Sequence, residues 1–210
     1  NGFWVGKKNY VLNVIDNEGV SYATPETKIT GIVKSSLPSK IRPMVKDFIT
    51  LLLAQKDRKS KESLEILNNY IVECTEKFMS LHPSEVGLNV QVNNVESAMS
   101  STGFPVKGAS INSVGAIYFN RFIRENNLSE FQKINEGDKM KYVYLTEPNP
   151  WGIHVMGFKD EGLPEAFWNY VDMNTMLDKA FYDILNIILS ASGIELSFQR
   201  ECDNIMSWLD

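Results

Sequence analysis

Two long stretches in which apolar residues recur every three or four positions constrain the fold of this 210-residue chain most strongly. Such spacing places the apolar side chains on one face of an α-helix, which then packs against a core. The positions are Ile41, Met44, Val45, Phe48, Leu51 and Leu52 in the first stretch and Leu64, Leu67, Ile71, Val72, Phe78 and Met79 in the second. The sequence therefore predicts two long amphipathic helices, separated by the polar tract 55–61.

Three further helices are expected nearer the C-terminus. A short one surrounds Val95–Met99, a second runs from about Ser113 to Asn126, and a long one spans about Asp172–Ser192. Asp172 is suited to cap the start of the last helix, and Gly193 is suited to the left-handed position after its end.

Strands are expected before this helical region and inserted within it. Tyr10–Ile15 and Val20–Ala23 flank turn residues, with Pro25 as a break after the second strand, while Lys139–Leu145 and Ile153–Phe158 form a second pair. The expected class is α+β: a small antiparallel β-piece followed by a mainly helical body with an inserted strand pair. The predicted domain boundary separates residues 1–34 from residues 35–210.

The charge is distributed unevenly along the chain. The net charge is −5, yet residues 1–60 carry ten Lys/Arg against five Asp/Glu, a net of +5, and residues 61–210 carry a net of −10. Such asymmetry fits a protein with one face toward an anionic partner, although ordinary surface variation is the competing explanation. No apolar run is long enough to cross a bilayer.

Motifs for self-contained chemistry are missing from the sequence. There is no phosphate-binding glycine loop, no dinucleotide fingerprint and no nucleophile elbow. Cys74 and Cys202 are expected to be reduced thiols, and His82 and His154 belong to no metal-ligand cluster. These observations favour a binding or structural role and predict no catalytic residue, metal ligand or cofactor in this chain.

The N-terminal segment Gly2–Val14 resembles the Lys-Lys-x-Tyr segment of family B DNA polymerases. With the flanking Phe-Trp and the following Asp-x-Glu-Gly turn, it is most similar to polymerases of T-even-type phages and their marine relatives. The resemblance implies that this segment is a palm strand, in which Lys8 and Tyr10 contact the primer–template and Lys7 contacts a phosphate. From the residues alone, a core aromatic is the favoured interpretation of Tyr10, and a solvated strand end is the alternative for the two lysines.

The resemblance continues through the rest of the chain and implies that residues 35–210 are the thumb domain. The family commonly has His at the position of Asn112 and Arg at the position of Val114, directly before Gly-Ala. A phosphate-binding arginine is therefore missing from this chain. Lys107 and Arg121 are expected to take over more of the grip. The segments that carry the resemblance are Lys107–Asn120, Ile134–Leu145, Glu147–Pro150, Leu163–Glu165 and Tyr170–Asp172.

The last residues, Asn204–Asp210, look like the short tail with which related phage polymerases dock on the sliding clamp. Met206, Trp208 and Leu209 would be its anchors, because an aromatic side chain presented at a terminus needs a pocket. The alternative is a tail that folds back onto the helix Asp172–Ser192.

The resemblance implies the C-terminal part of a DNA-directed DNA polymerase, in a truncated reading frame or as half of a split polymerase. The implied partners are primer–template DNA, the sliding clamp and the N-terminal remainder of the polymerase, in the host-cell cytoplasm and without a membrane. An exposed edge of the palm strands would also allow pairing with a second copy. The alternative is a stand-alone clamp- or protein-binding module without a role in DNA synthesis.

The family's exonuclease acids and paired catalytic aspartates lie upstream of the position of Lys7, so Mg²⁺ is expected only in the complete polymerase. We therefore expect the isolated chain to incorporate no nucleotide in a primer-extension assay with Mg²⁺. Metal-dependent synthesis by this chain alone would contradict that expectation.

Overall fold

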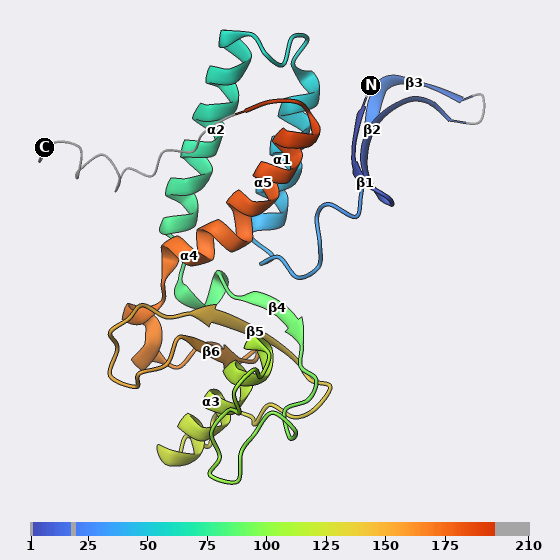
Figure 1. Cartoon of the computed structure of the whole chain (residues 1–210). Coiled ribbons are helices and arrows are strands. Elements are labelled where there is room, and N and C mark those ends of the chain that lie inside the picture. The colour runs from blue at the N-terminus through green and yellow to red at the C-terminus, as the bar shows by residue number, and fades with distance from the viewer. Residues whose placement is uncertain (1, 18–19, 196–210) are drawn as a thin grey trace, which may run out of the picture.

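The computed structural model describes residues 2–17 and 20–195. Figure 1 shows three parts: a small sheet of strands β1–β3, a group of helices containing α1, α2, α4 and α5, and a second sheet with helix α3 below them. The two small antiparallel sheets and the helices confirm the predicted α+β class. Within the described part of the chain, no helix is both long and apolar enough to span a membrane.

The first sheet is antiparallel in the order β1 (Gly2–Gly6), β2 (Asn9–Asn17) and β3 (Val20–Thr30). Strand β1 was not predicted, because a five-residue strand with glycine at both ends gives little periodic signal. The second strand was predicted to end at Ala23, before a break at Pro25, but β3 runs through Pro25 to Thr30. Proline is tolerated there because β3 is an edge strand, where a missing backbone N–H disturbs no inner pairing.

The helical part consists of α1 (Ile41–Ala54) and α2 (Lys61–Met79), followed much later by α4 (Met173–Leu177) and α5 (Asp183–Ala191). A π-helical segment, Asp178–Tyr182, joins α4 to α5. The single helix expected here is therefore continuous but contains a π-helical turn. Asp172 caps its start as predicted, because Oδ1 accepts a hydrogen bond of 3.0 Å from the Thr175 N–H.

The second sheet has the antiparallel order β4 (Leu88–Gln91), β5 (Lys139–Tyr144) and β6 (Val155–Phe158), and α3 (Ile111–Glu125) packs against β6. Short 3-10 helices, η1 (Pro83–Glu85) and η2 (Glu165–Tyr170), flank it in sequence. The sequence predicted β5 and β6 but missed the four-residue β4.

No helix forms at Val95–Met99, so the prediction of a short helix there was wrong. The Glu136 carboxylate accepts hydrogen bonds from the backbone N–H groups of Asn94 and Val95, and Asn94 has a positive φ of 64°. These bonds hold the segment in turns, and Met99 then forms an isolated bridge with Pro105.

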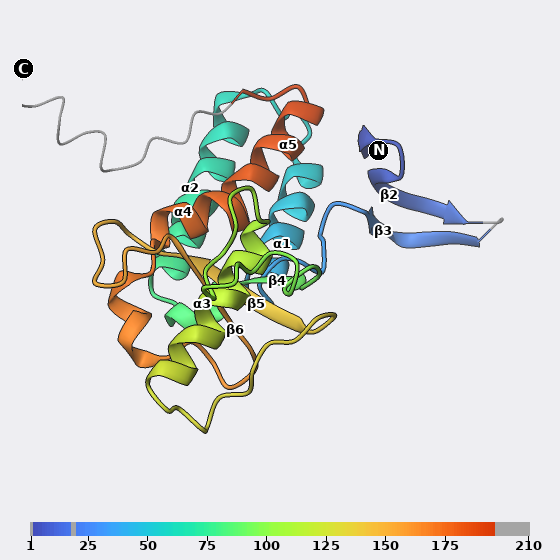
Figure 2. The ribbon, with the colours of Figure 1, turned by 60° about the horizontal axis from the view of Figure 1, so that its bottom comes forward.

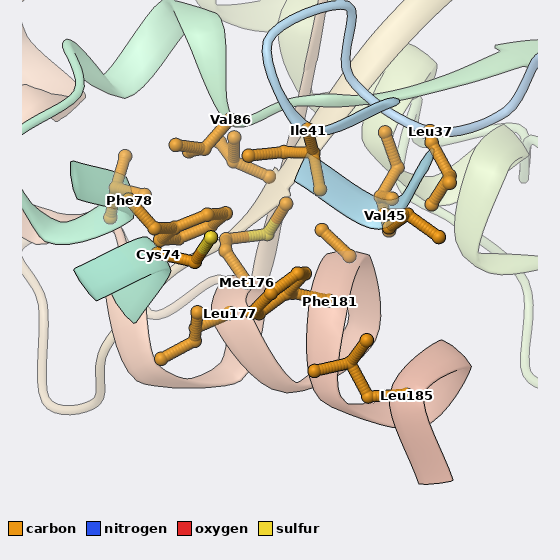
Figure 3. Packing of buried hydrophobic residues seen from close by; sticks show 14 of the residues in the cluster. Leu37, Ile41, Val45, Cys74, Phe78, Val86, Met176, Leu177, Phe181 and Leu185 are labelled. Atoms are coloured by element: carbon orange, nitrogen blue, oxygen red, sulfur yellow. The ribbon is translucent and has the colours of Figure 1, made fainter. Parts of the chain in front are cut away.

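One apolar core joins these parts. Figure 3 shows side chains from α4, α5 and the π-helical segment that point toward side chains of α1 and α2. The core extends to Phe3 and Val11 of the first sheet, which lies beside the helices in both views and contacts α5 through β1 (Figure 2). The labelled core residues are Leu37, Ile41, Val45, Cys74, Phe78, Val86, Met176, Leu177, Phe181 and Leu185.

The closest approach of α3 to the second sheet depends on two glycines. A Cβ added to Gly157 in β6 would lie 2.9 Å from the carbonyl carbon of Gly115 in α3. We expect Gly157→Ala to lower the free energy of unfolding by about 1–3 kcal/mol, because the helix must move away from the strand. Chemical denaturation measures this change.

Gly6→Ala is the matched control, since a Cβ there would have no atom within 4 Å. It should change the free energy of unfolding by less than about 0.5 kcal/mol. Equal stability of the two variants would contradict the close packing of α3 on β6.

Candidate nucleic-acid interface

Lys7 and Lys8 form the two-residue turn between β1 and β2. Gly6 pairs with Asn9 across the hairpin, and Lys8 has a left-handed backbone with a φ of 72°. The resemblance implies that Lys8 and Tyr10 lie in a palm strand, but Lys8 lies in the turn that precedes β2. Both lysine side chains are exposed at the tip of the hairpin.

The conformation of Lys8 has an energetic cost. A left-handed backbone is favourable for Gly or Asn in such turns and costs other residues about 1–2 kcal/mol. Among the described side chains, neither Lys7 nor Lys8 has an ion-pair partner that would offset this cost. The turn therefore presents two uncompensated cations, one of them in a strained backbone.

Tyr10 lies in β2 opposite Trp4 of β1. The neighbouring pair, Phe3 and Val11, is buried, so Trp4 and Tyr10 occupy the other face of the sheet, because side chains alternate along a strand. Tyr10 is half-buried and Trp4 is 65% exposed. Tyr10 is thus not part of the core but belongs to an aromatic pair close to the lysine turn.

The lysine turn lies against the start of the segment 31–40, which connects β3 to α1. Gly31 has a φ of +71°, and a Cβ built there would lie 2.7 Å from the carbonyl oxygen of Lys8. Only a glycine fits this approach, so the end of the first sheet and the beginning of the connecting segment are held together.

Lys107 lies in the connection between β4 and α3, directly before Gly108, which has a φ of +84°. Its side chain is exposed and has no ion-pair partner within residues 2–17 and 20–195. Ser110 then caps α3 by accepting a hydrogen bond from the Ser113 N–H at 3.3 Å. Lys107 is thus presented beside the start of α3.

Arg121 is more constrained than the three lysines. Its Nε donates a hydrogen bond of 2.7 Å to Glu125, and its guanidinium carbon lies 3.7 Å from the centre of the Phe104 ring. Glu125 offsets its charge, although stacking on Phe104 holds the guanidinium in place. Arg121 also lines a hollow of about 980 Å³ beside α3. Val114, at the family's arginine position, is buried.

The predicted residues thus form two groups. Lys7, Lys8 and Tyr10 come together at one end of the first sheet, whereas Lys107 and Arg121 belong to the part of the molecule that contains α3 (Figure 1). The predicted tail residues Met206, Trp208 and Leu209 lie outside the described residues, as does Cys202. Cys74 is a buried free thiol, and burial raises its pKa.

Two features were not predicted as sites. One is Trp4, whose pairing with Tyr10 depends on the unpredicted strand β1. The other is a groove lined by Arg42, Lys139, Lys141 and Lys159. The alternation of lysines in β5 can be seen in the sequence. The sequence does not show that Arg42 lies across the groove from them. Within the described part of the chain, no group of His, Cys, Asp or Glu is arranged to hold a metal ion.

Comparison with known proteins shows that the chain is similar to DNA polymerases. It is 29% identical over 201 residues to the DNA-directed DNA polymerase of Escherichia phage RB69, a match that covers 92% of this chain and 21% of that protein. It is 23% identical to the polymerase of Enterobacteria phage T4, over 96% of this chain and 22% of that protein. Both matches fall in the C-terminal part of the phage proteins, and the chain spans about a fifth of their length.

The fold comparison agrees with the sequence comparison. A family B DNA polymerase from the archaeon Pyrobaculum calidifontis matches 92% of this chain with a TM-score of 0.50 and 14% identity, over 21% of its own chain. No family model matches the sequence. The predicted resemblance to the C-terminal part of phage family B polymerases is confirmed.

The left-handed Lys8 allows stability and binding to be separated. Lys8→Gly should raise the free energy of unfolding by up to about 1.5 kcal/mol, because it removes about 1–2 kcal/mol of backbone strain and gives back about 0.4–1 kcal/mol through a more flexible unfolded chain. The same change should weaken binding to duplex DNA, because a cation is lost. Chemical denaturation and fluorescence anisotropy with a labelled duplex measure the two effects.

Lys7→Gly is the control, since it removes the same charge where φ is not positive. It should weaken DNA binding as well but should lower stability. If Lys8→Gly left duplex affinity unchanged, the strained lysine would have no role in holding DNA.

Proposed function

We propose that this chain is the part of a DNA-directed DNA polymerase that grips the primer–template duplex and tethers the enzyme to its sliding clamp during viral DNA replication in the host-cell cytoplasm. Its similarity to phage DNA polymerases supports a polymerase-related role. The observation that carries the proposed grip is the exposed Lys7–Lys8 turn, which keeps a lysine in a strained backbone beside Tyr10.

The ligand that suits these residues is a nucleic-acid backbone. A polymerase must hold duplex of any sequence, so its contacts go to phosphates and sugars instead of base edges. Lys7 and Lys8 supply positive charge for phosphates, and Tyr10 adds a flat ring and a hydroxyl group beside them. This combination binds a polyanion without reading its sequence.

The arrangement of the cations also favours an extended ligand. Lys107 lies in the connection between β4 and α3, whereas the lysine turn belongs to the first sheet, so the cations come from two different parts of the chain. A duplex carries one negative charge per about 1.7 Å of its axis and can reach separated cations along its length. Arg121 is assigned a smaller share of the grip, because Glu125 offsets its charge.

Tethering to the clamp is proposed for the tail with the anchors Met206, Trp208 and Leu209. Aromatic and large apolar side chains at the centre of an interface contribute most of its binding energy when they fill a pocket. The remainder of the polymerase, including the carboxylates that bind Mg²⁺, is assigned to a region outside the span matched by this chain.

The lysine turn is tested by the charge-removing double substitution Lys7→Gln/Lys8→Gln. Affinity for a primer–template duplex should fall, and the slope of log K against log salt should become shallower by about 2, since each phosphate contact contributes about 0.9. Fluorescence anisotropy over a range of salt concentrations measures both quantities.

The matched control is Lys56→Gln/Lys61→Gln, which removes two exposed lysines before and at the start of α2. This control should retain the wild-type slope. If both variants weaken binding equally, the turn has no specific role. A stand-alone clamp-binding module would give a different result. Its clamp binding would survive Lys7→Gln/Lys8→Gln and would be lost on removal of residues 204–210, while the chain would not bind DNA.

A further inference from the structure

A groove of about 520 Å³ lies between the segment 31–40 and strands β4 and β5. Ser35 and Ser36 line it from the connecting segment, and Arg42 lines it from the first turn of α1. Lys139 and Lys141 line it from β5, and Lys159 lines it from the residue after β6. Residues far apart in the sequence thus place four cationic side chains around one hollow.

Strand pairing explains why one wall of the groove is polar. Asn89 is the partner of Lys141 and Gln91 is the partner of Lys139, so these four side chains lie on the same face of the sheet. Met140 points to the opposite face, where its sulfur approaches Gly157 at the packing site of α3. One face of this strand pair is therefore covered by α3, and the other presents Lys139 and Lys141.

The charges in the groove are only partly compensated. Lys159 Nζ lies 3.1 Å from Asp138 Oδ2, and Asp138 is held ionised because the backbone N–H of Asn135 and then Lys159 lower the pKa of its carboxyl. Asp160 places a negative charge in the lining itself. Lys139 and Lys141 have no ion-pair partner among the described side chains, which leaves the groove positive.

Hydrogen bonds fix the two walls relative to each other. Arg42 donates from Nη2 to the carbonyl oxygen of Ser35 at 2.8 Å and from Nε to that of Leu37 at 3.0 Å. Asn89 donates from its backbone N–H to Ser36 at 2.8 Å and from Nδ2 to Leu37 at 2.8 Å. The groove is therefore formed before any ligand binds, which lowers the entropic cost of binding.

The lining selects among anionic ligands. It contains no aromatic side chain, so it offers no surface on which a base could stack. It also lacks the aromatic anchor pocket typical of a peptide-binding site, since the side chain of Met140 is buried on the other face. Lys, Arg, Ser and Gln together are the side chains that contact phosphate and sugar in protein–DNA complexes.

We infer that this groove binds the sugar-phosphate backbone of a DNA strand and extends the contact made by the Lys7–Lys8 turn. The carbonyl oxygen of Lys8 lies against Gly31, and the four residue-to-residue steps from Gly31 to Ser35 span at most about 14 Å. The turn and the groove can therefore contact the same strand. This inference rests on the proposed function, because it assigns a further contact to the same DNA.

The test substitution is Lys139→Gln/Lys141→Gln, which removes the two unpaired cations and leaves the hydrogen bonds of Arg42 and Asn89 in place. Probes are a primer–template, a blunt duplex and a single-stranded oligonucleotide, each of mixed sequence. We expect roughly ten-fold weaker primer–template binding and a slope in log salt shallower by about 2. Lys56→Gln/Lys61→Gln is again the charge-matched control, and thermal unfolding checks that both variants fold.

The outcomes separate this inference from the proposed function. If Lys7→Gln/Lys8→Gln weakens binding while Lys139→Gln/Lys141→Gln behaves as the control does, the groove is not a DNA site and the proposed function stands. If the wild-type chain binds none of the three probes, both ideas are wrong. Poly-glutamate that competes as well as DNA at equal charge would show a general polyanion site and overturn the inference.

Discussion

The arrangement of the molecule depends on how the segment 31–40 is braced. Arg42 and Asn89 bind the carbonyl oxygens of Ser35, Ser36 and Leu37, so α1 and β4 both hold this one short segment. At its other end, Gly31 packs against the lysine turn. Because these contacts join the first sheet, the helices and the second sheet, they determine where the cations of each part lie relative to one another.

The proposed affinity for an anion depends on local charge and not on net charge. The whole chain carries a net charge of −5, yet Lys7, Lys8, Lys139 and Lys141 all lack ion-pair partners among the described side chains. Four acids among the described residues pair with a cation four positions away along the chain, such as Glu73 with Lys77. Such exposed pairs contribute little to stability but remove those cations from competition for a ligand. Lys7 and Lys8 lie at one end of the braced segment and Lys139 and Lys141 near the other, where a polyanion gains by replacing their counterions.

The sequence predicted the long helices well because each buries one face over many turns, as with the stripe of Ile41, Val45 and Phe48. The sequence did not predict short elements whose structure depends on residues far away in the chain. Strand β4 exists through pairing with β5, about fifty residues away, and the turns at Val95 depend on the carboxylate of Glu136. The family resemblance pointed to Lys7, Lys8 and Tyr10, but the left-handed backbone of Lys8 required the hairpin register. The groove required both the sheet pairing and the bracing by Arg42.

The central claim is that unpaired lysines on both sides of the braced segment neutralise the phosphates of one DNA molecule. The most direct measurement is the slope of log K against log salt for the unaltered chain binding a primer–template of mixed sequence. With four such lysines engaged, the slope should be about −3.6, because each neutralised phosphate contributes about −0.9. A slope close to zero, or binding only to one particular base sequence, would contradict the account.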